Sequence, residues 1–126
     1  MTTPDDLPDD ERFQDACRDV ALRYAMYRNY HGDRTRAMRA LTRRTPGFTR
    51  TEREAALDLF CEAYRIARDA VPRHVLDRPD KTSRYAEADD IDFEALLAEV
   101  DQVRPGWAMK QKKIVASWAI LYCYLK

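Results

Sequence analysis

Apolar residues recur every three or four positions along most of this chain, which is the period of an amphipathic α-helix. The first stripe predicts a helix over residues 9–30 and consists of Phe13, Cys17, Val20, Tyr24 and Tyr27. Gly32 is a residue type that ends helices and Asp33 is a preferred N-cap, so we expect a second helix over residues 33–44. The apolar side of this second helix is short and consists of Ala37, Met38 and Leu41.

A proline–glycine pair then interrupts the helical pattern. Pro46, Gly47 and Phe48 form a corner, because proline cannot continue the helical hydrogen-bond ladder and glycine tolerates positive φ. A third helix of about 20 residues follows, and either Thr49 or Thr51 fits as its N-cap because each has a glutamate three residues later. We expect this helix to bury Ala56, Leu59, Phe60, Ala63, Ile66, Ala67 and Ala70.

The second half of the chain repeats this arrangement after a polar stretch. Residues 76–90 contain Pro79 and few apolar positions, which predicts a long surface loop. Asp89 or Asp90 then caps a fourth helix. Its expected buried face consists of Phe93, Leu96, Leu97, Val100 and Val103. A second corner follows, formed by Pro105, Gly106 and Trp107. A fifth helix over residues 109–125 is expected to bury Ile114, Val115, Trp118, Leu121, Tyr122 and Leu125.

These elements predict an all-α fold, a single-domain bundle of about five helices that covers residues 1–126. Residues 1–8 are polar and acidic, and we expect them to be a disordered N-terminal tail. When the two corners are aligned, the helices around them align as well, although only the Pro-Gly pair is identical. We therefore expect an internal duplication, with two helix–Pro-Gly-aromatic–helix hairpins packed face to face and the N-terminal helix covering them.

The composition excludes several classes of function. Only three glycines are present, so the chain contains neither a P-loop nor the glycine-rich turn of dinucleotide-binding folds. The longest apolar run, residues 114–125, is interrupted by Ser117 and is too short to span a membrane. The first residues lack the apolar segment of a secretory signal, so we expect a cytoplasmic protein with no membrane attachment.

The cysteines and histidines indicate neither a metal site nor catalysis. The three cysteines are widely spaced in apolar surroundings without any Cys-x-x-Cys motif, so we expect buried free thiols and no metal or other cofactor. His31 lies in the last turn of the predicted first helix, and His74 lies near another helix end. Neither serine lies in a G-x-S-x-G nucleophile elbow. We therefore expect no catalytic residues.

The charges cancel overall but are segregated along the chain. Twenty-two basic and 22 acidic residues give a formal net charge of zero. Residues 1–20 hold seven acids and two bases, whereas residues 21–53 hold nine arginines against two acids. Residues 76–104 hold nine acids and four bases, and residues 105–126 carry four lysines and no acid. Function therefore depends on whether these blocks meet inside the fold or face outward.

The predicted second helix carries the main candidate binding surface. Arg36, Arg39 and Arg43 are three and four positions apart, so we expect them to project together. Clustered guanidinium groups suit carboxylates and phosphates, because each presents several donors in a planar fork. The full candidate surface consists of Tyr30, Arg34, Arg36, Arg39, Arg43, Arg44 and Arg50. The alternative is that the acidic first or fourth helix neutralises this face within the fold.

A second candidate is an anion site at the start of the predicted fifth helix. Lys110, Lys112 and Lys113 lie at the positive end of the helix dipole, and no capping side chain is evident there. A bound anion would compensate both the lysines and the unpaired backbone N–H groups. The alternative is a frayed helix end with solvated lysines.

The sequence favours a non-enzymatic protein of an adaptor, regulatory or neutralising type. It would act through protein–protein contacts, with the arginine-rich helix face as the contact surface. The partner would be another protein or a second copy of the chain. The alternative is a nucleic-acid or phosphate-ligand binder that uses the segment from Arg34 to Arg50 and the lysines of the last helix. Zero net charge favours the first hypothesis, because nucleic-acid-binding domains usually carry a net positive charge.

Overall fold

The computed structural model describes residues 7–26, 29–75, 91–103 and 109–124, and within these ranges the fold is all-α. Its α-helices are α1 (Glu11–Ala25), α2 (Arg34–Arg44), α3 (Arg50–Ala70), α4 (Phe93–Val103) and α5 (Met109–Tyr124). A 3₁₀ turn, η2 (Val71–His74), continues from α3. The predicted all-α bundle is therefore confirmed. None of the described helices combines the length and the apolar character that crossing a bilayer requires.

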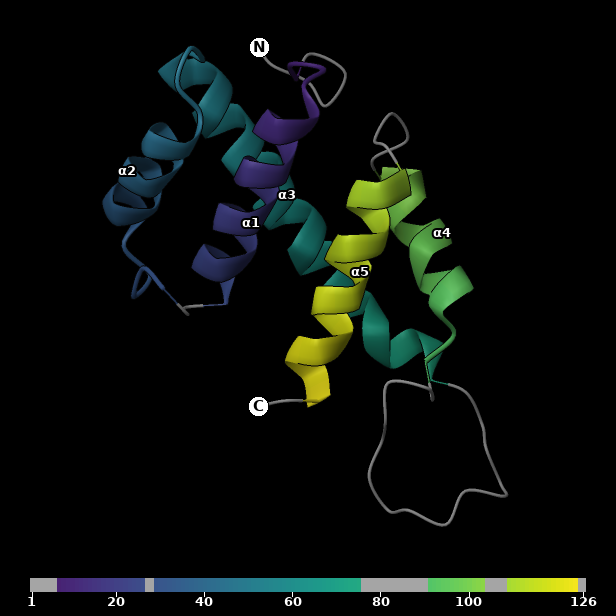
Figure 1. Cartoon of the computed structure of the whole chain (residues 1–126). Coiled ribbons are helices and arrows are strands. Elements are labelled where there is room, and N and C mark those ends of the chain that lie inside the picture. The colour runs from purple at the N-terminus through teal and green to yellow at the C-terminus, as the bar shows by residue number, and fades with distance from the viewer. Residues whose placement is uncertain (1–6, 27–28, 76–90, 104–108, 125–126) are drawn as a thin grey trace.

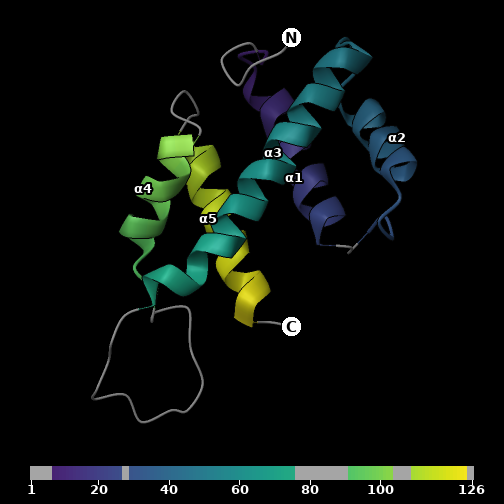
Figure 2. The same cartoon turned by 180° about the vertical axis from the view of Figure 1, so that it is seen from behind.

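The long helix α3 is the element on which the others pack (Figure 1). The opposite views in Figures 1 and 2 show α1 and α2 beside its first half and α4 and α5 toward its C-terminal end. Helix α1 contacts α2 and α5 as well as α3, so it lies between α2 and α5.

The core is one continuous cluster to which all five described α-helices contribute. Phe13 of α1, Phe60 of α3 and Val115 of α5 each expose 1% of their surface or less. Phe48, the aromatic residue of the first corner, stacks on Phe13 with ring centroids 4.2 Å apart. Gly47 beside it has a φ of 90°, which favours glycine at this corner. The corner aromatic thus fixes α1 against the start of α3.

The helix starts of α2 and α3 follow local signals in the sequence. The Asp33 carboxylate accepts hydrogen bonds from the backbone N–H groups of Thr35 and Arg36 at 2.9 and 3.4 Å, as expected for an N-cap. Helix α3 begins after Thr49, whose hydroxyl accepts from the Glu52 N–H at 3.1 Å. The Glu52 carboxylate in turn accepts from the Thr49 N–H at 2.8 Å, which completes a capping box.

The first helix is shorter than predicted. Helix α1 ends at Ala25 rather than at residue 30. His31 and Gly32 have positive φ angles of 51° and 73°, which are incompatible with a continuing right-handed helix. The Asp33 N–H donates to the Tyr30 carbonyl at 2.7 Å and closes this turn. His31 therefore lies in the turn before α2 and not in the last turn of a helix.

The fourth helix has a different cap from those expected. The Asp92 carboxylate accepts a hydrogen bond from the Ala95 N–H at 3.1 Å, so Asp92 caps α4. The predicted caps Asp89 and Asp90 lie outside the described residues. Asp92 is one position before the first helical residue, which is the usual place for this interaction.

Several other predictions concern parts of the chain outside the described residues. These parts are residues 1–6 of the predicted tail, the predicted loop 76–90, and the second corner at Pro105, Gly106 and Trp107. Within the described part of the predicted tail, Leu7 packs partly against the core. The Pro8 carbonyl also accepts a hydrogen bond from Gln14 Nε2 at 3.0 Å. The end of the predicted tail is therefore attached to α1.

The buried faces of α3 and α5 differ from the predicted stripes. On α3, Leu57 is fully buried, whereas the expected core residue Leu59 is half-buried. On α5, Leu121 is 43% exposed, although the apolar pattern predicts its burial. The small residues Ala116 and Ala119 are buried instead. Small side chains let helix backbones approach closely, so the contact with α3 selects this side of α5.

Candidate anion-binding groove

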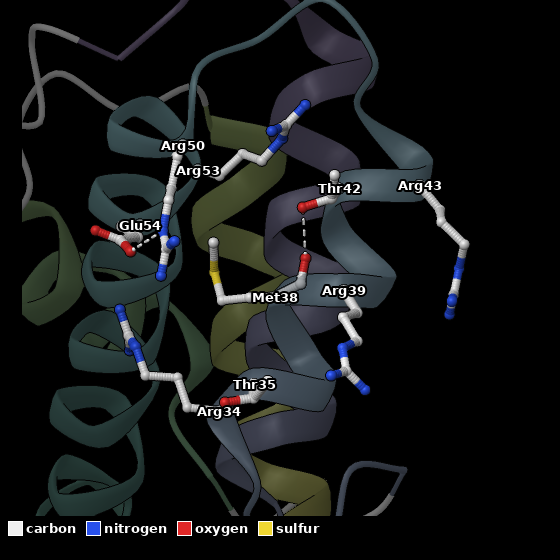
Figure 3. A pocket seen from close by; sticks show the side chains of 9 residues that line it. All are labelled: Arg34, Thr35, Met38, Arg39, Thr42, Arg43, Arg50, Arg53 and Glu54. Carbon is white, nitrogen blue, oxygen red and sulfur yellow. Dashed lines mark hydrogen bonds and ion pairs between the residues drawn. The ribbon is translucent and has the colours of Figure 1, made fainter.

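A groove lies between α2 and the first turns of α3, with a volume of about 570 Å³ (Figure 3). We call it the arginine groove. It is lined by Arg34, Thr35, Met38, Arg39, Thr42, Arg43, Arg50, Arg53 and Glu54. Its volume falls within the range of sites that enclose a small ligand or a few side chains of a partner.

The repeat of the α-helix explains which residues form the two walls. The α2 wall consists of three adjacent pairs spaced four residues apart: Arg34 and Thr35, Met38 and Arg39, Thr42 and Arg43. The α3 wall comes from its first two turns, with Arg50, Arg53 and Glu54. The first corner folds α3 back beside α2, so arginines of two helices face one space.

Arg53 is held in place by the first corner. Its Nε donates to the Thr45 hydroxyl at 2.8 Å, and its Nη2 donates to the Thr45 carbonyl at 2.6 Å. The Thr45 hydroxyl itself donates to the Leu41 carbonyl at 2.7 Å, and Thr45 is 2% exposed. Because two bonds orient the guanidinium of Arg53, little conformational freedom is left for it to lose when a ligand binds.

The groove carries an excess of positive charge. Five arginines and one glutamate line it. Arg50 pairs with Glu54 at 2.9 Å, and Arg34 pairs with Asp58 of α3 at 2.8 Å. Arg39 and Arg43 are exposed and have no ion pair with any residue that the structure describes. Their charges are therefore available to a ligand.

The floor of the groove has an apolar component. Figure 3 shows the Met38 side chain extending from α2 into the space between the helices. Met38 is half-buried and packs against the core, so contacts with core residues hold its side chain in position. The Thr42 hydroxyl donates to the Met38 carbonyl at 2.8 Å and is turned back onto its own helix. The groove thus combines a cationic rim with a flexible thioether at its floor.

The structure brings together only part of the predicted arginine surface. Arg34, Arg39, Arg43 and Arg50 line the groove, whereas Arg36 and Arg44 do not. Arg36 pairs with its own N-cap Asp33 at 3.6 Å, and Arg44 pairs with Asp19 of α1 at 2.5 Å. Tyr30 is half-buried in the turn before α2 and does not line the groove.

Sequence reasoning did not include Arg53 in the site. The available signal was its spacing of three residues from Arg50, which places both on one side of the first turns of α3. Arg36 is a candidate by its spacing of three residues from Arg39, but it lies outside the groove and pairs with Asp33 at the start of α2.

Most acids of α1 and α4 pair with bases outside the groove. Lys110 of α5 donates to Glu11 and Asp15 of α1 at 2.6 and 3.0 Å. Glu99 of α4 pairs with Arg73 and with His74 of η2. On the arginine-rich helix α2, Asp19 of α1 pairs with Arg44, which also lies outside the groove. The expected neutralisation by the acidic helices thus reaches Arg44 and leaves Arg39 and Arg43 unpaired within the described part of the chain.

The three lysines at the start of α5 do not form one cationic cluster. Lys110 is held between two carboxylates of α1, and the hydrogen bonds that it donates to Glu11 and Asp15 raise its pKa above the usual value. Lys112 is 5% exposed and pairs with Asp101 of α4. Lys113 is exposed, with no ion pair among the described residues. The first two lysines therefore link α5 to α1 and α4.

The described thiols are poor nucleophiles. Burial raises the pKa of Cys17 to about 12 and that of Cys61 to about 11, so both remain protonated near neutral pH. Within the described ranges, no group of three or more histidine, cysteine and acidic side chains is arranged to hold a metal ion. The arginine groove is therefore the feature on which a functional assignment can rest.

No family model, no curated protein and no solved structure matches this chain. A functional assignment therefore has to come from the site rather than from a relative. The relevant properties are the excess of guanidinium groups, their exposure and the apolar floor at Met38. These properties are chemically compatible with an anionic ligand that also has apolar groups.

Proposed function

We propose that this protein is a non-enzymatic binding protein whose arginine groove holds an acidic segment of a partner protein. The observation that carries the proposal is the exposure of Arg39 and Arg43 without ion pairs in the described chain, beside three further arginines. Guanidinium groups bind carboxylates with two parallel hydrogen bonds, and arginine is enriched in protein interfaces. A role as an adaptor, regulator or neutralising partner follows from such binding.

A protein partner fits the groove better than a nucleic acid does. The whole chain has no net charge, so it lacks the long-range positive field that attracts polyanions. Single-stranded nucleic acids also rely on aromatic side chains for stacking, and none of the described residues that line the arginine groove is aromatic. Met38 at the floor instead suits an apolar side chain between acidic residues.

The test compares a charge reversal inside the groove with one outside it. The probe is a fluorescein-labelled peptide of about 20 residues, rich in glutamate with a central leucine, measured by anisotropy at about 50 mM salt. The double variant Arg39→Glu/Arg43→Glu is expected to weaken binding by about tenfold or more. Arg36→Glu is the matched control, because Arg36 lies on the same helix and does not line the groove.

Arg36→Glu is expected to change the affinity by less than about twofold. The proposal is overturned if the wild-type protein does not bind the peptide, or if Arg36→Glu weakens binding as much as the double variant. A single-stranded DNA probe of the same length distinguishes the nucleic-acid alternative. Tighter binding of the DNA than of the peptide, lost in the double variant, would assign the groove to nucleic acid.

A further inference from the structure

A second hollow lies farther along α3, with a volume of about 240 Å³. We call it the distal hollow. It forms where the end of α1 and the turn before α2 meet the middle of α3. It is lined by Tyr24, Ala25, Gly32, Cys61, Tyr64, Arg65 and Arg68.

One stripe of α3 connects the two hollows. Its members are spaced three or four residues apart, so they share one face of the helix: Arg50, Glu54, Asp58, Cys61, Arg65 and Arg68. The first two line the arginine groove, and the last three line the distal hollow. From Arg50 to Arg68 this face is about 27 Å long at the helical rise per residue.

The ion pair between Arg34 and Asp58 lies at the junction. Arg34 lines the arginine groove, and Asp58 lies on the α3 stripe between the two hollows. Both charges act on Cys61 in the distal hollow, since Asp58 raises its pKa and Arg34 lowers it. The two hollows are therefore within electrostatic reach of the same pair, whose side chains are 41% and 63% exposed.

The charges along this face are arranged as positive, negative and positive. The arginine groove supplies one positive end, through Arg39 and Arg43. Arg65 supplies the other end, because it is exposed and makes no ion pair within the described ranges. Asp58, which lines neither hollow, supplies a carboxylate between the two ends. A matching ligand has acidic groups at its two ends and neutral groups in its middle.

We propose that the arginine groove and the distal hollow form one elongated surface for a protein segment with two acidic clusters separated by a neutral stretch. This inference rests on the proposed function and specifies the partner segment. A segment of about 18 residues spans the surface if it is helical, and about 8 residues suffice if it is extended. A nucleic acid fits less well, because its evenly spaced phosphates place a negative charge opposite Asp58.

The test uses two labelled peptides measured by fluorescence anisotropy. The long peptide has about 18 residues, with a glutamate block at each end of a serine–glutamine middle, and the short one carries a single block. If both ends bind at once, the long peptide binds about tenfold tighter than the short one. Arg65→Glu is expected to remove this gain and to leave the short peptide unaffected. Arg39→Glu/Arg43→Glu is expected to weaken the binding of both peptides.

The matched control is Arg12→Glu, an exposed arginine of α1 that lines neither hollow. Thermal unfolding by circular dichroism verifies that each variant is folded, and Arg65→Gln replaces Arg65→Glu if the latter unfolds. Equal affinity for the two peptides, or a gain that survives the Arg65 substitutions, overturns the elongated surface. In that outcome, weaker peptide binding by Arg39→Glu/Arg43→Glu still supports the arginine groove alone. If neither the Arg39→Glu/Arg43→Glu variant nor the Arg65 variant changes peptide affinity, both proposals are overturned.

Discussion

Arg34 Nη1 donates to Asp58 Oδ1 at 2.8 Å across the contact between α2 and α3. The pair places a carboxylate of the chain itself on one of the five arginines of the groove. Both side chains are well exposed, so the pair contributes little to stability. If the groove binds an acidic segment as we propose, the pair competes with the ligand, because an incoming carboxylate must displace Asp58 or bind beside it.

Replacing Asp58 by asparagine is therefore expected to strengthen ligand binding. Asp58→Asn frees the Arg34 guanidinium and removes a negative charge from the junction of the two hollows, so the affinity for acidic peptides rises by about threefold to tenfold. A peptide with glutamates along its whole length gains more than one with a neutral middle. Anisotropy titrations of both peptides check this expectation, and unchanged or weaker binding contradicts it.

The Thr45 hydroxyl is expected to matter more for stability than that of Thr42. Thr45 is buried, donates to the Leu41 carbonyl and accepts from Arg53, whereas Thr42 is exposed and bonds only within α2. Thr45→Val therefore lowers the free energy of unfolding by about 1–2 kcal/mol, and Thr42→Val changes it by less than about 0.5 kcal/mol. Urea denaturation measures both, and equal effects would show that the corner bond to Arg53 contributes nothing.

Substitutions of Lys112 and of Asp101, which form an ion pair, are expected to change the free energy of unfolding unequally. Lys112 is 5% exposed and Asp101 is half-exposed, so only the lysine charge is strongly desolvated. Asp101→Asn leaves that charge unpaired and destabilises the fold by about 1–3 kcal/mol. Lys112→Met removes the buried charge and keeps the aliphatic packing, so its effect is close to zero or stabilising. A larger loss in Lys112→Met than in Asp101→Asn, by urea denaturation, rules this interpretation out.

The contacts of Glu99 predict an acid-dependent loss of stability. Its carboxylate contacts His74 Nε2 at 2.5 Å and also pairs with Arg73, and hydrogen bonds from His74 and then Arg73 lower its pKa below the usual 4.5. Because the folded-state pKa is below the unfolded one, the stabilisation is present above pH 4.5 and is lost as the pH falls through the lower folded-state value.

Glu99→Gln is therefore expected to cost about 1 kcal/mol at pH 7, and this cost is expected to shrink as the pH falls through the lowered folded-state pKa, because the wild-type carboxylate then becomes protonated as well. Urea denaturation at several pH values provides the measurement. Glu94→Gln serves as the control, because Glu94 is an exposed residue on the same helix. If the loss of stability in Glu99→Gln is the same at every pH, the stabilisation does not depend on the negative charge of the Glu99 carboxylate.

Local interactions account for the parts of the structure that were predictable. The capping box of Thr49 and Glu52 and the N-cap Asp33 depend on residues three or fewer positions apart, so the starts of α2 and α3 are encoded in short segments. The C-terminal end of α1 was less predictable. The apolar stripe continues to residue 27, so it predicts a longer helix. The turn at His31 and Gly32 has positive φ angles, and the spacing of apolar side chains carries no information about these backbone angles.

The candidate site was partly predictable for the same reason. The run of arginines on α2 is visible in the sequence, but the side of the helix that faces a groove depends on where α3 packs. Arg36 and Arg39 are equally good candidates by spacing, and only Arg39 lies in the groove. The spacing of Arg53 from Arg50 indicates only a shared side of α3, because the role of Arg53 follows from its hydrogen bonds to the two oxygens of the buried Thr45.

The sequence by itself determined the helices, the N-caps of α2 and α3 and the segregation of acids and arginines, because these depend on neighbours within a few positions. Only the tertiary structure decided which acid meets which base. Asp19 pairs with Arg44, and Glu11 pairs with Lys110 at the far end of the chain. Those pairings follow from the packing of α1 against α2, α3 and α5, which no local interaction specifies. In these pairings the acids of α1 form ion pairs with bases outside the groove, and Arg39 and Arg43 stay exposed.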